Sequence, residues 1–143
     1  MPPPRFRQAF RRRLLRWYDA HGRDLPWRST PDPYHILVSE VMLQQTQVDR
    51  VLPKYDEWLR RYPSLEALAA AAEDDVVKAW YPLGYNIRPQ RLQAIARESV
   101  TRFGGELPSD RKTLQSFKGI GPYTAGAILS FAFGQRAAIL DTN

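Results

Sequence analysis

Cysteine is absent from the 143 residues, and histidine occurs only at His21 and His35. Without cysteine, these residues can form no disulfide bond and no thiolate metal site. Two isolated histidines do not indicate a metal site of another kind. We therefore expect no metal or other cofactor within this chain.

Long hydrophobic runs are also absent, since no apolar segment approaches the roughly 18 residues of a membrane-spanning helix. This pattern excludes an integral membrane protein, and no signal peptide is evident. We expect a cytoplasmic protein without a membrane partner, associated with the nucleoid if its source is bacterial.

Lysine is scarce, and most of the 21 basic residues are arginines. The net charge of +6 and the sequence pI near 9.9 favour a polyanionic partner. The planar guanidinium fork suits phosphate groups. The arginines are densest between Arg5 and Arg16, where an organelle transit peptide is an alternative. The usual serines of such a peptide are missing, so we expect a helix packed in the fold with a basic face.

Strand patterns are nearly absent, whereas helical spacing and capping residues recur along the chain. The apolar residues of the first helix lie at helical spacing: Phe6, Phe10, Leu14 and Trp17. The other helices that we predict are Pro33–Thr46, with Asp32 as its cap and Pro33 as its first residue, Val48–Tyr62, Leu65–Ala72, Glu73–Trp80, Asn86–Phe103, a short one between the Asp110 cap and Phe117, and one from Pro122 to about Gly134. The sequence thus predicts an all-α bundle of eight or nine short helices.

The segment Gly119-Ile120-Gly121-Pro122 predicts a tight hairpin between two helices. Glycine tolerates positive φ and carries no Cβ, and proline suits the first position of a helix. The exposed N–H groups of such a helix start can bind a phosphate. An ordinary αα-corner with a glycine turn is the alternative. The apolar residues before the hairpin and the small residues after it favour phosphate binding.

Glu40 lies on the predicted helix from Pro33 to Thr46 and shares a face with Ile36, Leu37 and Leu43. A carboxyl group in a core helix is expected to have a raised pKa, because burial disfavours the charged form. Such a group can act as a general acid near neutral pH. The alternative is a structural glutamate that caps a loop backbone.

Asp141 follows an apolar run near the end of the chain. Taken alone, this aspartate indicates the N-cap of a helix. Together with Glu40, it could form a pair of carboxylates around a glycosidic bond, one protonating the leaving group and one stabilising the sugar cation. The N-glycosidic bond of a nucleotide can be broken by the same pair of roles.

Several motifs resemble those of one protein family, and they occur here in the same order. They are Leu25–Arg28, Pro33-Tyr34, Ser39–Val48, Leu83–Tyr85, the glycine hairpin, Ala125–Ser130 and Ile139–Asp141. Together they resemble the adenine-removing, MutY-like branch of the helix-hairpin-helix DNA glycosylase superfamily. The resemblance implies a helix-hairpin-helix glycosylase bundle that removes adenine paired with 8-oxoguanine or guanine in double-stranded DNA. We expect it to act as a monomer.

The resemblance also implies roles for individual residues. Glu40 would protonate the adenine, and Asp141 would stabilise the sugar cation. Tyr123 stands where lyase-competent, endonuclease III-like members have a Schiff-base lysine, which implies a monofunctional enzyme. The positions that match the pocket for the extruded base are Arg23, Trp27, Arg28, Leu43 and Val48.

A second set of residues would contact the duplex. On the hairpin they are Lys118, Gly119, Gly121, Tyr123 and Thr124. Gln44 would also contact the DNA, and those that would wedge beside the 8-oxoguanine are Gln45, Thr46, Leu83 and Tyr85. Such contacts offset the cost of unstacking a base. For Trp27 and Tyr85, plain packing in the core or in a loop is the alternative.

The resemblance leaves two other functions open. Tyr123 also occurs in T/G-mismatch glycosylases, so a T/G or U/G mismatch glycosylase is the second candidate, although Gln44-Gln45 favours adenine. Relatives also continue into a second lobe whose four cysteines hold a [4Fe–4S] cluster, which this sequence lacks. We therefore expect a truncated chain, with 1–28 and 135–143 in an incomplete second lobe and 29–134 as the helical domain. A non-catalytic DNA-binding fragment is the third candidate.

Overall fold

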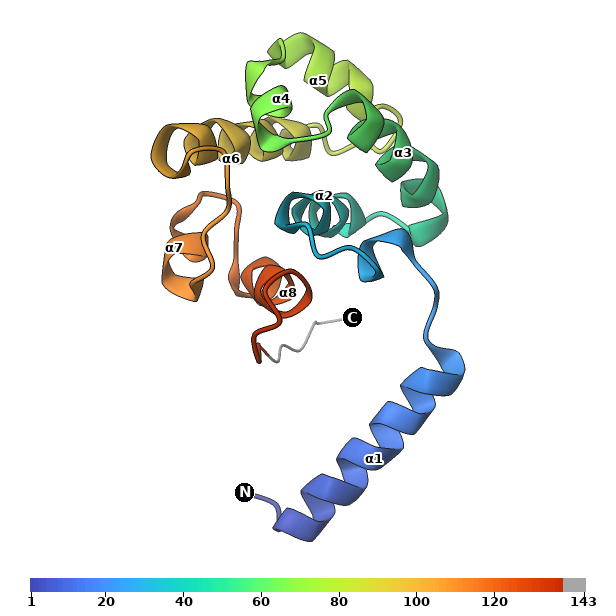
Figure 1. The fold of residues 1–143 in the computed structure, drawn as a ribbon. Coiled ribbons are helices and arrows are strands. Elements are labelled where there is room, and N and C mark those ends of the chain that lie inside the picture. The colour runs from blue at the N-terminus through green and yellow to red at the C-terminus, as the bar shows by residue number, and fades with distance from the viewer. Residues whose placement is uncertain (138–143) are drawn as a thin grey trace.

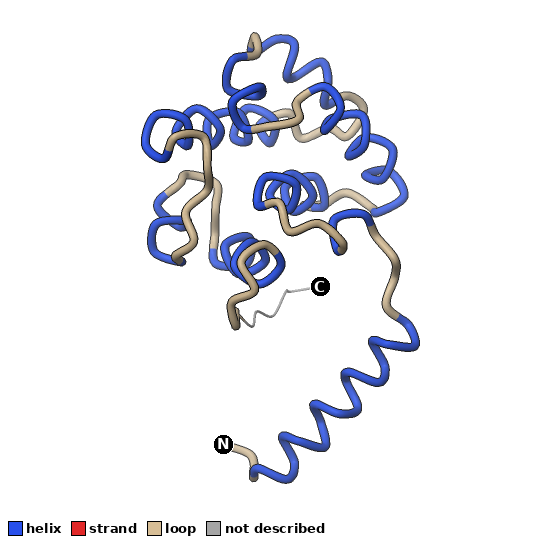
Figure 2. The backbone as a smooth tube through the Cα atoms, in the orientation of Figure 1, coloured by secondary structure: helices blue, strands red, loops and turns tan. Residues whose placement is uncertain are grey.

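The computed structural model describes residues 1–137, which contain helices, turns and loops but no strand (Figures 1 and 2). The elements are α1 (Pro4–His21), the 3₁₀ helix η1 (Pro26–Arg28), α2 (Pro33–Leu43), α3 (Val48–Arg61), α4 (Leu65–Ala70), α5 (Glu73–Trp80), α6 (Ile87–Phe103), α7 (Arg111–Ser116) and α8 (Pro122–Phe131). The predicted all-α class is confirmed. Within residues 1–137, no helix has both the length and the apolar character needed to cross a membrane.

Helix α2 lies in the middle of the bundle and packs against η1, α3, α6 and α8 (Figure 1). Its buried residues are Tyr34, Ile36, Leu37, Val38, Ser39, Val41 and Met42. Because apolar side chains point to nearly every side, such a helix is stable only within a core. The prediction that the helix carrying Glu40 runs through the core is confirmed.

The two ends of α2 differ in how well the sequence predicted them. Asp32 caps the helix by accepting a hydrogen bond from the Tyr34 N–H at 2.9 Å, and Pro33 occupies the first helical position, as predicted. The other end lies at Leu43, so the predicted end near Thr46 is wrong. Gln45 has a φ of 55°, in the left-handed region, and this conformation cannot continue a right-handed helix.

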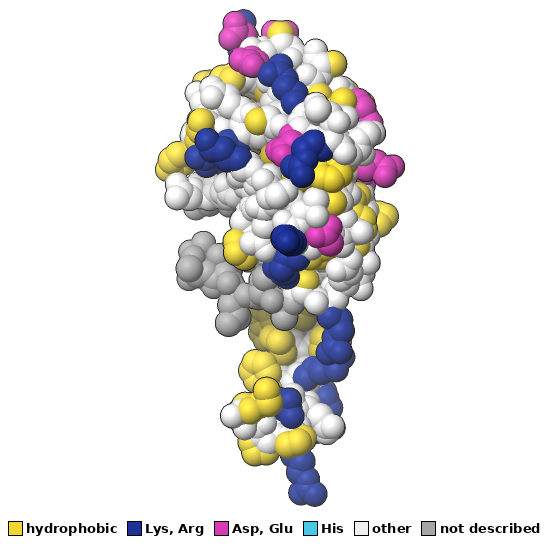
Figure 3. All heavy atoms as spheres, turned by 90° about the vertical axis from the view of Figure 1, so that its left-hand side faces the viewer, with side chains coloured by type: hydrophobic (Ala, Val, Ile, Leu, Met, Phe, Trp, Pro, Cys, Tyr) yellow, Lys and Arg dark blue, Asp and Glu magenta, His cyan; other side chains and the backbone are white. Residues whose placement is uncertain are grey.

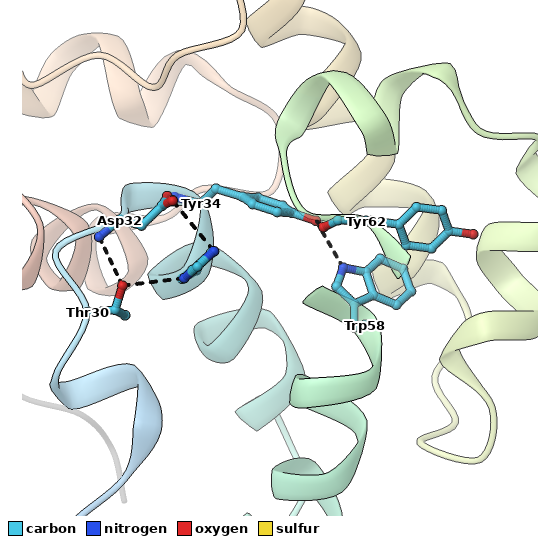
Figure 4. A network of polar contacts seen from close by, with 6 residues as sticks. Thr30, Asp32, Tyr34, Trp58 and Tyr62 are labelled. Atoms are coloured by element: carbon cyan, nitrogen blue, oxygen red, sulfur yellow. Dashed lines mark hydrogen bonds and ion pairs between the residues drawn. The ribbon is translucent and has the colours of Figure 1, made fainter. Parts of the chain in front are cut away.

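Buried hydrogen bonds fasten α2 to α3 (Figure 4). The Tyr34 hydroxyl donates to the Tyr62 carbonyl at 2.8 Å and accepts a hydrogen bond from the Trp58 indole N–H at 3.2 Å. Ahead of α2, the Thr30 hydroxyl accepts a hydrogen bond from the Asp32 N–H at 3.2 Å. These contacts hold the helix that carries Glu40 in a defined position.

The remaining helices form around this core, with α6 packed against both α4 and α5. Helix α4 ends at Ala70 instead of Ala72, because Ala71 is already extended with a ψ of 154°. Helix α6 ends at Phe103, and Gly104 caps it with a φ of 65°, in the left-handed region. Helix α8 ends at Phe131, before the predicted Gly134.

Helix α1 extends away from the rest of the bundle (Figure 1) and contains no buried residue. Its apolar side chains at Phe6, Phe10, Leu14 and Trp17 are each more than half exposed, at 61%, 61%, 53% and 58%. Figure 3 shows apolar and basic side chains on the surface of this helix. The predicted helix exists, but the prediction that it packs in the fold is wrong. An α-helix forms its backbone hydrogen bonds internally, so it does not need to pack against another element to satisfy them. No element of residues 1–137 buries this helix.

Candidate DNA interface and active site

The glycine hairpin forms between α7 and α8, as predicted. Asp110 caps α7 by accepting hydrogen bonds from the Thr113 N–H at 2.9 Å and the Thr113 hydroxyl at 2.8 Å. The two bonds lower the pKa of the Asp110 carboxyl. Leu114, Phe117 and Ile120 are buried at 0%, 1% and 3% exposure. These three apolar side chains anchor the hairpin to the core, so its backbone is held in place without a ligand.

The two hairpin glycines serve different purposes. Gly119 has a φ of 99°, which strains any residue with a side chain, although a Cβ there would meet nothing closer than 3.8 Å. Gly121 has an ordinary φ of −88°, and a Cβ there would point into open space. Gly119 is thus needed for the turn, whereas Gly121 leaves the approach to the helix start open.

The N-terminus of α8 faces this open approach. The Ala125 N–H makes the first backbone hydrogen bond of the helix, to the Gly121 carbonyl at 3.0 Å. N–H groups ahead of such a bond have no partner within their own helix, and they carry the positive end of its dipole. This geometry suits an anion.

Three basic residues lie on or beside the hairpin. Lys118 is exposed on the hairpin itself. Arg111 donates a hydrogen bond to the Pro122 carbonyl at 3.3 Å. The Cβ and Cδ atoms of Arg91 lie 3.8 Å from the position that a Cβ on Gly119 would take. The hairpin therefore combines a helix N-terminus with positive side chains, the arrangement expected for a DNA phosphate.

The other predicted hairpin residues differ in exposure. Tyr123 is 42% exposed at the start of α8, whereas Thr124 is buried at 4%. Little of Thr124 is accessible, so its predicted role in DNA binding would depend on the backbone rather than the side chain.

Glu40 is half-buried on α2. Because α2 packs against α8, the predicted acid and the hairpin belong to neighbouring elements. Asp141 lies outside the described residues. The pairing of the two carboxylates therefore stays a prediction.

The predicted base-pocket residues lie at two places in the fold. Arg23 and Arg28 line a surface hollow of about 340 Å³ between α1 and η1, where the Arg28 guanidinium donates to the Arg23 carbonyl at 2.8 Å. Trp27 is buried, with its ring 5.2 Å from that of Tyr55 in an edge-to-face contact. The burial of Trp27 matches the packing alternative, and its role in a base pocket stays a prediction.

The other two base-pocket residues lie where α2 ends and α3 begins. Leu43 and Val48 are partly buried and pack against the core. They flank the α2–α3 turn (residues 44–47). Leu43 was expected inside the preceding helix and is instead its last residue, and Val48 begins α3 as predicted. Their role in a base pocket stays a prediction.

The predicted wedge residues lie on two loops, the α2–α3 turn and the α5–α6 loop (residues 81–86). Gln44 and Gln45 are exposed on the turn, and Tyr85 is 62% exposed on the loop. Leu83, in contrast, is buried at 3%. Exposure favours a DNA contact for the first three, whereas Leu83 belongs to the core in this structure.

Arg88 is a residue of this interface that sequence reasoning missed. It lies in the first turn of α6 and is buried, with 4% of its surface exposed. Burial lowers its pKa. Its guanidinium contacts both loops: it donates to the Thr46 hydroxyl at 3.0 Å and to the Gly84 carbonyl at 3.2 Å. A cation at a helix N-terminus opposes the helix dipole, and this mismatch was the signal that could have identified it.

Metal ligands are not grouped in the described part of the chain: residues 1–137 contain no cluster of three or more histidines, cysteines or acids that could hold a metal ion. A [4Fe–4S] cluster requires cysteine thiolates, and the sequence contains no cysteine. Residues 1–143 therefore do not fit such a cluster.

Comparison with known proteins places the chain in one family. Residues 38–143 match the family model described as HhH-GPD superfamily base excision DNA repair protein. The adenine DNA glycosylase of Homo sapiens is 46% identical over 144 residues, which cover 94% of this chain and 26% of that protein. A thymine-DNA glycosylase of Aeropyrum pernix is 41% identical over 138 residues, covering 95% of this chain and 62% of that protein.

A solved structure agrees with these relatives. The structure of a thermostable thymine-DNA glycosylase superposes with a TM-score of 0.90 at 33% identity, covering 94% of this chain and 63% of that one. The chain spans about a quarter of the human relative and less than two thirds of the other two proteins. Since the family model matches well over half of its residues, this chain belongs to the HhH-GPD superfamily of base excision DNA repair proteins.

Proposed function

We propose that this chain is the helical core of a monofunctional DNA glycosylase that removes adenine paired with 8-oxoguanine or guanine. One observation carries the proposal: a half-buried glutamate, Glu40, lies on the core helix that packs against the hairpin helix α8. A strand bound by its phosphates at the hairpin would lie next to the acid. The similarity to adenine DNA glycosylase supports adenine as the base.

In the proposed reaction, Glu40 donates a proton to the extruded adenine. The N-glycosidic bond then breaks, and its electron pair leaves with the base. The carboxylate of Asp141 stabilises the sugar cation until water adds at C1′ and loses a proton. In this proposal residues 29–134 carry the phosphate and acid sites, and 1–28 and 135–143 belong to a second lobe.

Single-turnover excision from a duplex with an adenine opposite 8-oxoguanine tests the proposal. We expect Glu40→Gln to slow excision by about 10²- to 10⁴-fold, because the amide cannot donate the acid proton. Glu106→Gln is the matched control, since Glu106 is exposed on the loop after α6. Equal rates for wild type and Glu40→Gln would remove Glu40 from the reaction.

The monofunctional mechanism makes a second prediction in the same assay. Strand breaks should need alkali, and borohydride should trap no covalent enzyme–DNA adduct, because Tyr123 cannot form a Schiff base. A trapped adduct would contradict this part of the proposal.

A T/G or U/G mismatch glycosylase is the second candidate. The thymine-DNA glycosylases that resemble this chain favour it, and Tyr123 is compatible with it. Duplexes with a G·T or G·U pair distinguish the two candidate activities. Faster excision of thymine or uracil than of adenine would make the mismatched pyrimidine the substrate.

A non-catalytic DNA-binding fragment is the third candidate. It predicts duplex binding that weakens with salt and no abasic product. We further propose that the protein acts as a monomer on chromosomal DNA, which lies in the nucleoid if the source is bacterial. Sedimentation of the free protein and of its duplex complex would test the one-to-one stoichiometry.

A further inference from the structure

Two exposed residues near each other in the fold have strained backbones. Gln45 in the α2–α3 turn has a φ of 55°, and Tyr85 in the α5–α6 loop has a φ of 48°. For a residue with a side chain, this conformation is strained, because the Cβ atom comes too close to the following carbonyl oxygen. It persists only where the surrounding structure holds it, and it is frequent at functional sites.

A single guanidinium holds both loops. Arg88 donates to six oxygen atoms of the two loops and of the last turn of α2: the carbonyls of Val41, Met42, Gln44, Leu83 and Gly84 and the hydroxyl of Thr46. The distances to Met42 and Leu83 are 2.9 and 3.3 Å. Because the guanidinium is planar and rigid, these bonds fix the position of one loop relative to the other.

The same group also positions an aromatic ring. The Arg88 guanidinium carbon lies 5.4 Å from the centre of the Tyr85 ring and 5.1 Å from that of the Trp80 ring. Trp80 is fully buried, whereas Tyr85 is mostly exposed. Arg88 therefore connects the core to the exposed tyrosine through cation–π contacts.

The position of Arg88 is not explained by the stability of its own helix. A cation in the first turn of α6 opposes that helix dipole. Within residues 1–137 no carboxylate forms an ion pair with it, and its Nε atom has no hydrogen-bond partner. Its positive charge instead faces the carbonyls of Val41 and Met42 at the end of α2, where the dipole of that helix is negative. The buried charge thus serves the two loops.

We propose that Arg88 is a positioning residue that joins the α2–α3 turn and the α5–α6 loop into one rigid double wedge for duplex DNA. Gln45 and Tyr85 are the two points of this wedge, and Arg88 sets their separation before DNA binds. The inference rests on the proposed function, because the ligand of the wedge is the base-paired duplex. A preformed wedge avoids the entropic cost of ordering two loops while a base pair is opened.

Two duplexes containing 2-aminopurine at the target position test this proposal. In one the base is paired and stacked, and in the other it lies in a small bulge and is already unstacked. Fluorescence anisotropy measures affinity, and the 2-aminopurine emission measures unstacking. We compare the full chain with its Arg88→Lys, Arg88→Met and Thr46→Val variants.

We expect Arg88→Met to bind the paired duplex about tenfold or more weakly, since the hydrogen bonds that fix the two loops relative to each other are lost and the loops must be ordered during binding. Its affinity for the bulged duplex should stay within about twofold of wild type. Arg88→Lys should behave similarly, because a lysine ammonium lacks the planar fork. Thr46→Val removes one acceptor without touching the core and should give a smaller shift in the same direction.

Arg97→Ala is the matched control. Arg97 is another arginine of α6; it donates to the Ala69 carbonyl at 3.3 Å and to the Glu73 carboxylate at 2.7 Å, away from both loops. Its loss should lower the melting temperature but leave the ratio of the two affinities unchanged. An unchanged ratio in the Arg88 variants and in Thr46→Val would overturn the proposal. If wild type itself binds neither duplex, the proposed function fails instead.

Discussion

Trp58 donates a hydrogen bond from its indole N–H to the hydroxyl of Tyr34 at 3.2 Å, and this hydroxyl donates in turn to the Tyr62 carbonyl at 2.8 Å. All three residues are buried. The chain of bonds joins α2, which carries Glu40, to α3 and the residue after it. The stability of the fold and the position of the predicted acid therefore depend on one hydroxyl group.

Tyr34→Phe should lower the free energy of unfolding by about 1–3 kcal/mol, because it leaves the Trp58 N–H and the Tyr62 carbonyl unpaired in the core. Urea denaturation followed by tryptophan fluorescence would measure the change. Tyr62→Phe is the matched control, since the Tyr62 hydroxyl is buried and has no hydrogen-bond partner among residues 1–137. Removing that hydroxyl should leave stability unchanged or raise it. Equal losses in both variants would contradict the assignment.

High pH should destabilise the fold through buried tyrosines. Burial raises the pKa of Tyr55 from 10.0 to about 12, and it raises that of Tyr34 as well. Between these values the unfolded chain has lost the phenolic proton and the folded chain keeps it. Stability is therefore fully present below pH 10 and falls as the pH rises toward 12.

The Tyr55→Phe variant isolates this effect. Between pH 10 and 12, wild type should lose up to about 1.4 kcal/mol more per pH unit than the variant. Urea midpoints at several pH values would show it as a flatter profile for Tyr55→Phe. Parallel profiles would mean that the Tyr55 hydroxyl ionises equally in both states.

The two hairpin glycines should respond differently to alanine. Gly119→Ala should destabilise the fold by about 1–2 kcal/mol, because alanine is strained at a φ of 99°. Gly121→Ala should leave the melting temperature nearly unchanged, since its φ is ordinary and the space beside it is open. It should nevertheless weaken duplex binding, because the new methyl group occupies the approach to the α8 N-terminus. If Gly121→Ala bound duplex as well as wild type, the phosphate would not bind at this point.

Gln45→Gly should separate stability from function. Glycine removes the strain of a φ of 55°, so the variant should gain about 1 kcal/mol in the free energy of unfolding. It also removes the amide that would enter the duplex, so unstacking of 2-aminopurine should decrease. Gln45→Ala keeps the strain and loses the same amide. It should show the same loss of unstacking without the gain in stability.

Local patterns predicted much of the fold because they act within a few residues. Asp32 and Asp110 were recognised as caps, and Pro33 and Pro122 as first helical residues, from neighbours in the sequence alone. The glycine hairpin was predicted for the same reason. The end of α2 was predicted too late, because the backbone leaves the helix at Gln44, whose carbonyl accepts a hydrogen bond from Arg88, far along the chain in α6.

Exposure was harder to predict, because it depends on what packs against a residue. Leu83 and Thr124 were assigned to the DNA surface by their place in motifs, yet both are buried. The apolar face of α1 predicted a packed helix, but no element of residues 1–137 buries it.

The sequence by itself determined that the chain is helical, where most of its helices start and that a glycine hairpin precedes α8, since caps, prolines and glycines act on their immediate neighbours. It also determined the family, through motifs that keep their order. Only the tertiary structure decided that Arg88 joins two loops and that Tyr34 joins two helices. The contacts of Arg88 with the end of α2 and with Thr46, and those of Tyr34 with Trp58 and Tyr62, each span 20 or more positions of the chain. They depend on how the whole bundle packs rather than on any local pattern.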